Sequence, residues 1–156
     1  MCNVIFIFGP SCSGKSSLGQ ALQQSLGSKW TYIDRDNLIE QNLSPESAAD
    51  AMLDTKIQSI GQNIIIDAQV PWRKKKHGEF YFLLLPPLQV LLHRDAERTL
   101  KLQRSPIRAG HARTYVIETY EILNKTHKTV FDHCFNSSQY TIDTGVETIR
   151  LIAKLN

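Results

Sequence analysis

Several classes of protein are excluded by what this chain has little of. Its 156 residues contain three cysteines, Cys2, Cys12 and Cys134, which are too few and too scattered for a disulfide framework. No apolar run approaches the roughly 20 residues that a membrane span needs. We therefore expect a cytoplasmic protein with no membrane partner.

The chain also has no internal repeat, low-complexity tract or linker. We expect one domain over residues 1–156, which is long enough for a sizeable core. The first strand is expected to begin at Asn3, which leaves no room for a signal peptide. The net charge of +3 suits an anionic ligand but does not require a nucleic-acid partner.

One motif carries a specific chemistry. Residues Gly9 to Ser16 read Gly-Pro-Ser-Cys-Ser-Gly-Lys-Ser and match the phosphate-binding pattern G-x-x-x-x-G-K-[ST]. An apolar run from Asn3 to Phe8 precedes the motif, and apolar residues at helical spacing from Leu18 to Leu26 follow it. A glycine loop between a strand and a helix is the context in which this pattern binds phosphate.

The loop predicts a site for ATP and Mg²⁺. Glycines let consecutive backbone N–H groups face an anion, and the helix dipole adds positive potential. Lys15 can reach the β- and γ-phosphates, and the Ser16 hydroxyl can bind Mg²⁺. The residues expected to contact ATP are Gly9, Ser11, Cys12, Ser13, Gly14, Lys15, Ser16 and Ser17.

Apolar strands and amphipathic helices alternate along the chain, which predicts an α/β fold. We expect the fold of P-loop nucleoside triphosphate hydrolases, a five-stranded parallel sheet with helices on both faces. The expected strands are Asn3–Phe8, Trp30–Asp34, Asn63–Asp67, Leu88–His93 and Tyr140–Asp143. The expected later helices begin at Ser44, Asp95, Tyr115 and Val146. Residues Phe80 to Leu85 fit either a buried helical turn or an extra strand.

Acidic residues end the second and third expected strands, at the edge where ligands bind. A phosphoryl acceptor needs a group that orients its hydroxyl and accepts its proton, and a carboxylate can do this. We favour Asp36 over Asp34 for that role, although both could instead cap the following loop. Asp67 is placed to hold Mg²⁺ or its waters.

Five arginines fall within twenty residues and suggest a lid over the phosphates. We place this lid at about residues 98–113, because Pro106, Gly110 and His111 are expected to interrupt the helix there. Arg104 and Arg108 flank the interruption and are the preferred catalytic arginines. The other members of the group, Arg94, Arg98 and Arg113, fit surface positions equally well, the first two as partners of nearby acids.

The basic run Arg73-Lys-Lys-Lys-His77 could bind RNA, but a solvated loop is the favoured interpretation. No aromatic residues alternate with the charges, as they would in a surface on which bases stack. A GTPase is disfavoured as well, because Asn124-Lys125 is not followed by the aspartate of a guanine-reading motif.

Together these residues resemble the small P-loop kinases, which include gluconate, shikimate and nucleoside-monophosphate kinases and chloramphenicol phosphotransferase. The similarity is greatest to chloramphenicol phosphotransferase. The matching segments are Gly9 to Ser17, Asp36 to Glu40, Asn63 to Asp67, Arg104 to Gly110 and Tyr140 to Thr144. The resemblance implies that Asp36 is the catalytic base and that Tyr140 to Thr144 form the last strand.

The resemblance does not extend to the acceptor. The segment between Asp36 and Asp67 is shorter than in the family, and Ala68 stands where chloramphenicol phosphotransferase has an acid. We expect an ATP-dependent phosphotransferase acting on a hydroxyl of a small molecule. The alternatives are a nucleotide or RNA 5′-hydroxyl kinase and a nucleotide-binding regulatory module without turnover.

Overall fold

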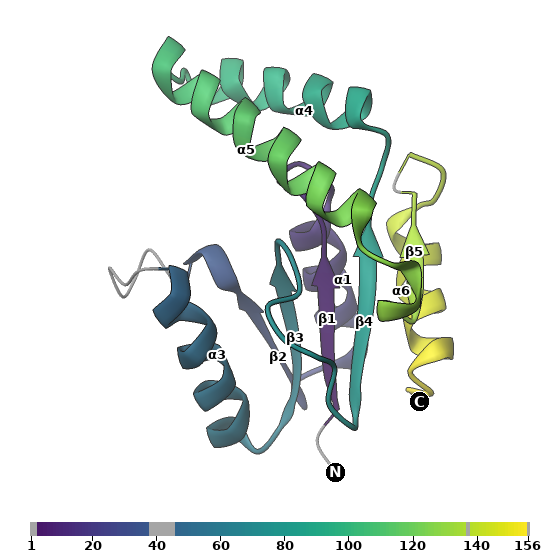
Figure 1. The fold of residues 1–156 in the computed structure, drawn as a ribbon. Coiled ribbons are helices and arrows are strands. Elements are labelled where there is room, and N and C mark those ends of the chain that lie inside the picture. The colour runs from purple at the N-terminus through teal and green to yellow at the C-terminus, as the bar shows by residue number, and fades with distance from the viewer. Residues whose placement is uncertain (1–2, 38–45, 137, 156) are drawn as a thin grey trace.

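The computed structural model describes residues 3–37, 46–136 and 138–155. Its centre is a five-stranded sheet in the order β2-β3-β1-β4-β5, in which every neighbouring pair is parallel (Figure 1). The strands are β1 Val4–Phe8, β2 Trp30–Asp34, β3 Asn63–Ala68, β4 Glu79–Leu84 and β5 His133–Phe135. The α/β fold of P-loop nucleoside triphosphate hydrolases predicted from the sequence is therefore confirmed.

Helices cover both faces of the sheet. The helices are α1 Lys15–Leu26, α3 Glu46–Ile60, α4 Leu88–Lys101, α5 Pro106–Lys125 and α6 Ile142–Ile152, with a short 3₁₀ helix η1 at Lys128–Val130. Helices α1 and α6 pack on one face, and α3 and the end of α5 pack on the other. Figure 1 shows α4 and the start of α5 beyond the carboxyl ends of the strands. No helix in the described part of the chain has the length and apolar character of a membrane span.

The uniformly apolar sequence of β1 follows from its central position. Ile5 and Ile7 belong to the core cluster beneath α1 and α6, while Phe6 and Phe8 belong to the cluster beneath α3 and α5. Side chains alternate between the faces of a strand, and both faces here are covered. A strand in this position has no solvent side and therefore carries no polar alternation.

The expected fourth strand at Leu88–His93 is wrong, because these residues begin α4. The fourth strand is β4 instead, so Phe80 to Leu84, which the sequence left open, is extended. Pro86 and Pro87 separate the two elements, and Pro87 is the N-cap of α4. Proline ends strand pairing and suits a helix start, so the proline pair marks a boundary that apolar content alone did not reveal.

The expected fifth strand at Tyr140–Asp143 is also wrong. Thr141 is the N-cap of α6 and forms a capping box with Thr144, so the chain is already entering the helix. The fifth strand is the three-residue β5, at His133–Phe135. It follows the short helix η1.

Helix α5 is longer at its start than the sequence suggested. Ser105 caps it by accepting a hydrogen bond from the backbone N–H of Arg108, and Pro106 occupies the first turn. Gly110 lies inside α5, as does His111. The predicted interruption at Pro106, Gly110 and His111 is therefore wrong, and the turn between α4 and α5 precedes Pro106.

Helix α3 spans Glu46–Ile60 and lies where the sequence predicted a helix from Ser44 onward, and Gly61 follows with a φ of 59°. Ser44 and Pro45, the expected start signals, lie outside the described residues. The connection from β3 to β4 at residues 69–78, all of it described, contains no helix. A charged cluster packs that connection onto the sheet.

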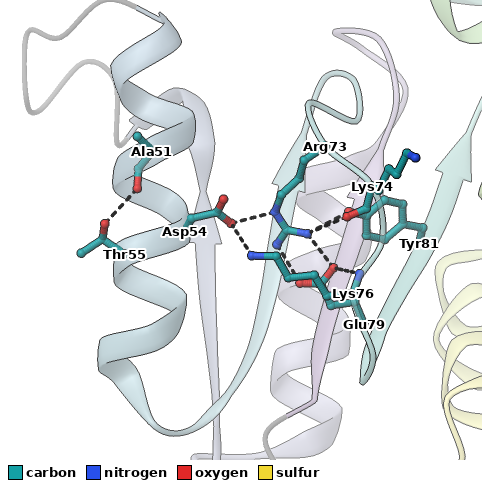
Figure 2. Close-up of polar contacts among 8 residues, drawn as sticks. All are labelled: Ala51, Asp54, Thr55, Arg73, Lys74, Lys76, Glu79 and Tyr81. Atoms are coloured by element: carbon teal, nitrogen blue, oxygen red, sulfur yellow. Dashed lines mark hydrogen bonds and ion pairs between the residues drawn. The ribbon is translucent and has the colours of Figure 1, made fainter.

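Arg73 is the centre of this cluster (Figure 2). Its guanidinium donates to both carboxylate oxygens of Glu79 at 2.8 and 2.7 Å and to Asp54 of α3 at 2.7 Å. It also lies 5.5 Å from the ring centre of Phe6. Hydrogen bonds from Arg73 and from the backbone of Lys76 outweigh burial and hold the pKa of Glu79 below its ordinary value. The cluster joins the β3–β4 connection, which contains no helix, to α3 and to β4.

We predict that Glu79→Gln lowers the free energy of unfolding by about 2–3 kcal/mol, because it leaves the Arg73 charge poorly paired. Wild-type stability from this carboxylate is present above the unfolded pKa of about 4.3 and is lost as the pH falls through the lower folded pKa. Urea unfolding between pH 3 and pH 7 measures both effects.

Glu121→Gln is the matched control, since Glu121 pairs with Lys125 on the exposed surface of α5. Exposed pairs of this kind contribute little, so a change below about 0.5 kcal/mol is expected. Equal losses in the two variants would contradict a stabilising role for the cluster.

Candidate phosphate-binding site

A pocket of about 540 Å³ lies at the carboxyl ends of β1, β2 and β3. This is the edge of an open α/β sheet at which ligands bind. Its lining residues are Ser11, Cys12, Gly14, Lys15, Ser16, Ser17, Asp34, Asp36, Asn37, Asp67, Gln69, Arg94 and Arg98. The structure thus gathers most of the predicted loop residues with acids from two other strands.

The loop has the backbone that its glycines suggest. Gly14, the N-cap of α1, has a φ of 98°, and Cys12 also has a positive φ of 67°. Gly9 is needed for a different reason, since a Cβ there would lie 2.5 Å from the backbone oxygen of Leu84. The first glycine permits close packing against β4, and the second permits the turn into the helix.

Lys15 is the buried cation of the site. Lys15 is only 7% exposed, and its Nζ donates a hydrogen bond to the backbone oxygen of Pro10 at 3.1 Å. Burial lowers the pKa of Lys15, while the nearby carboxylates of Asp67 and Asp36 oppose that effect. A second source of negative charge, such as a phosphate, would favour the charged ammonium further.

Asp67 receives two short hydrogen bonds on one oxygen. Ser16 Oγ and the Tyr32 hydroxyl each donate to its Oδ2 at 2.7 Å. Burial raises the pKa of Asp67, and the charge of Lys15 opposes this rise. No motif pointed to Tyr32, although residues two apart on a strand share a face and Tyr32 precedes Asp34 by two.

The Ser16–Asp67 pair has the oxygen chemistry that Mg²⁺ prefers. Magnesium in nucleotide sites takes one or two protein oxygens and completes its shell with phosphates and water. The described residues contain no group of three histidine, cysteine or acidic side chains that could hold a metal ion by themselves. The donor set fits a metal that arrives with a nucleotide.

The aspartate that ends β2 and the aspartate two residues later make different contacts. Oδ1 of Asp34 accepts hydrogen bonds from the backbone N–H groups of Asp36 at 2.9 Å and Asn37 at 3.2 Å, so this side chain caps the turn. Oδ2 of Asp36 accepts from Nε2 of Gln69 at 3.1 Å. Asp34 therefore orders the local backbone, and Asp36 presents an exposed carboxylate to the pocket.

The structure places the arginines differently from the expected lid. Arg104 donates to Asp95 at 3.0 Å and does not line the pocket, and Arg108 is exposed in the first turn of α5. Arg94 and Arg98 line the pocket instead. They donate to the backbone oxygen of Cys12 at 3.3 Å and to the hydroxyl of Ser11 at 3.4 Å, respectively. One helical turn separates the two, so both reach the loop from one face of α4.

The segment after β3 also lines a second, largely apolar pocket. Gln69 faces the phosphate-binding pocket, and the next residue, Val70, lines a cavity of about 560 Å³ between this segment and the end of α5. The other lining residues are Pro71, Trp72, Arg73, Lys74, Lys75, Ile122, Thr126, Thr129 and Val130.

We predict that Gly9→Ala weakens ATP binding by at least about tenfold and destabilises the fold, because the added methyl would meet the backbone of β4. Gly110→Ala is the control. Gly110 lies within α5, and the methyl group added there would meet no heavy atom within 4 Å. Alanine there should raise stability by about 0.5–1 kcal/mol. Calorimetric ATP titration and thermal unfolding measure the two effects, and unchanged ATP affinity in Gly9→Ala would refute the packing argument.

Comparison with known proteins supports the resemblance found in the sequence. The family model of chloramphenicol phosphotransferase-like proteins matches residues 2–59, which include the loop, β2 and Asp36. No curated protein matches the chain. The family model and the fold of the structural neighbours together confirm the predicted resemblance to small P-loop kinases.

Three solved structures illustrate the fold. Shikimate kinase from Acinetobacter baumannii in complex with shikimate has a TM-score of 0.65 and 15% identity, covering 99% of this chain and 94% of that one. A gluconokinase from Sinorhizobium meliloti 1021 has a TM-score of 0.66 and 18% identity, covering 97% and 91%. The Deinococcus radiodurans tunicamycin resistance protein has a TM-score of 0.63 and 13% identity, covering 100% and 98%.

Proposed function

We propose that this protein is an ATP- and Mg²⁺-dependent phosphotransferase that moves the γ-phosphate to a hydroxyl of a small molecule in the cytoplasm. One observation carries the proposal: the loop lysine, the Ser16–Asp67 pair and the Asp36 carboxylate line a single pocket. A kinase needs a phosphate site, a metal site and a base within reach of one another.

The loop would hold the nucleotide by charge and geometry. Backbone N–H groups of the loop and of the first turn of α1 bind the phosphates together with the ammonium of Lys15, and the α1 dipole adds to the attraction. Ser16 and Asp67 supply the protein oxygens for Mg²⁺. When bound, Mg²⁺ neutralises the charge of the transferring phosphate.

Asp36 is the proposed base, because its carboxylate is exposed to the pocket while Asp34 is engaged in the turn. Arg94 and Arg98 are already beside the loop and can stabilise phosphate charge there. A catalytic role for Arg104 and Arg108, in a lid at about residues 98–113, stays a prediction. Arg104 would have to leave Asp95 to act on a phosphate.

The acceptor is proposed to be a metabolite or antibiotic that carries a hydroxyl group. The fold of enzymes named for shikimate and gluconate, and of a tunicamycin resistance protein, supports a small molecule. The pocket is also polar and of a size that suits phosphates with a compact acceptor. A single chain of this fold can thus bring both reactants to one sheet edge.

An RNA acceptor is the second candidate, and the structure weakens its main support. Of the basic run at residues 73–77, Arg73 pairs with Asp54 and Glu79, and Lys75 pairs with Asp132 at 2.7 Å. Charge already compensated inside the protein is poorly available to a phosphate backbone.

We predict that Lys15→Ala lowers the rate of phosphoryl transfer at least about 100-fold, because the charge on the β- and γ-phosphates loses its buried partner. Asp36→Asn should lose a similar factor while ATP binds within about twofold of wild type, since the amide cannot take a proton. Lys29→Ala, on the exposed surface, is the control. Single-turnover transfer and equilibrium ATP binding separate the roles, and full activity in Asp36→Asn would disprove the base assignment.

A panel of hydroxylated metabolites, antibiotics and 5′-hydroxyl oligonucleotides with γ-³²P-ATP tests the acceptor class. We expect transfer to a small molecule and none to RNA. Salt-independent binding of an oligonucleotide would argue further against nucleic acid, since phosphate contacts weaken with salt. ATP binding without transfer to any compound would favour the regulatory module and refute the proposed activity.

A further inference from the structure

We propose that Gln69 is a positioning residue that holds the carboxylate of Asp36 toward the acceptor. This inference rests on the proposed function, because it assigns Asp36 the role of base. It goes further by identifying the residue that fixes the base relative to the phosphate loop. Nothing in the motif pattern of the sequence pointed to this glutamine.

Gln69 contacts both halves of the site. Its backbone oxygen accepts a hydrogen bond from the N–H of Gly9, the first glycine of the loop, at 3.3 Å. Its side-chain Nε2 donates to Oδ2 of Asp36 at 3.1 Å. One residue therefore ties the place where phosphate binds to the group that would receive the acceptor's proton.

The orientation of the amide follows from chemistry. An ionised carboxylate only accepts hydrogen bonds, so the NH₂ group of Gln69 must face Asp36. The bond engages Oδ2 and restrains rotation of the carboxylate, which makes Oδ1 the oxygen directed to an incoming hydroxyl. Misplacement of a catalytic group by about 1 Å can cost about 100-fold in rate.

Stability alone does not account for a glutamine at this position. Gln69 is 5% exposed, and its Oε1 is buried with no hydrogen-bond partner among the described residues. A buried polar atom without a partner costs free energy, so an apolar side chain of the same shape would suit the fold equally well or better. Buried polar groups that do not stabilise the fold are found where function requires them.

The test is Gln69→Met, which keeps the length of the side chain and the backbone bond to Gly9. We expect kcat to fall about tenfold or more, KM for ATP to stay within about twofold, and Tm to stay level or rise by a few degrees. A structural role would produce the opposite pattern, in which Tm falls and ATP binding weakens. Gln58→Met, at an exposed position on α3, is the control and should change neither quantity.

A second variant varies charge instead of shape. Gln69→Glu places a second carboxylate against Asp36, where the two repel. We expect a larger loss of kcat than in Gln69→Met, again with ATP affinity preserved. Wild-type kcat in either variant would overturn the inference, as would a fall in Tm of more than about 5 °C in Gln69→Met.

A readout without turnover separates this inference from the proposed function. In ¹H–¹⁵N spectra, the side-chain NH₂ signals of Gln69 should shift in Asp36→Asn, which removes the charged partner, and should not shift in the surface variant Asp143→Asn. Signals unmoved in Asp36→Asn would overturn the inference and leave the proposed activity standing. Absence of transfer in the wild type, with the shift present, would overturn the activity and support the contact.

Discussion

The site depends on a single constraint, the burial of a positive charge. Lys15 begins α1 with its ammonium inside the protein, where burial lowers its pKa and its hydrogen-bond partner among the described residues is a backbone oxygen. Asp67 and Asp36 lie near enough to oppose that shift. A charge held in this way is poorly solvated, and a nucleotide phosphate is the partner that would complete its surroundings.

The sheet supplies this constraint through its strand order. Because β1 and β3 are neighbours and parallel, the loop after β1 and the acid that ends β3 emerge side by side. β2, on the other side of β3, adds Tyr32 to the same acid. The hydrogen bonds that converge on Asp67 are thus a consequence of topology. They would not form if the strand order differed.

Ion pairs hold two segments outside the phosphate-binding pocket. The connection between β3 and β4 has no helix and is anchored by Arg73, whose charge is divided between Glu79 and Asp54. Above the sheet, Arg104 pairs with Asp95 across the turn between α4 and α5. Arg104, which the sequence favoured for phosphate, is thus held by an acid, whereas Arg94 and Arg98 of α4 line the phosphate-binding pocket.

Sequence patterns predicted elements well where their cause is local. The motif at residues 9–16 specifies its own turn, and the short apolar run that ends at this turn predicts a buried strand. The patterns failed where segments of similar apolar composition form different elements. Phe80 to Leu84 and Leu88 to His93 are both apolar, and the position of a proline pair decides which is strand and which is helix. β5 has three residues, too few to show any periodicity.

By itself the sequence predicted a phosphate-binding loop, because the glycines and the lysine of the motif lie within one short segment and act through their own backbone. It also determined the α/β fold, through the alternation of apolar strands and amphipathic helices. Only the tertiary structure decided which side chains meet the loop. Tyr32 comes from β2, Gln69 from the segment after β3, and Arg94 and Arg98 from α4, and their convergence depends on strand order and helix rotation, which no local pattern encodes.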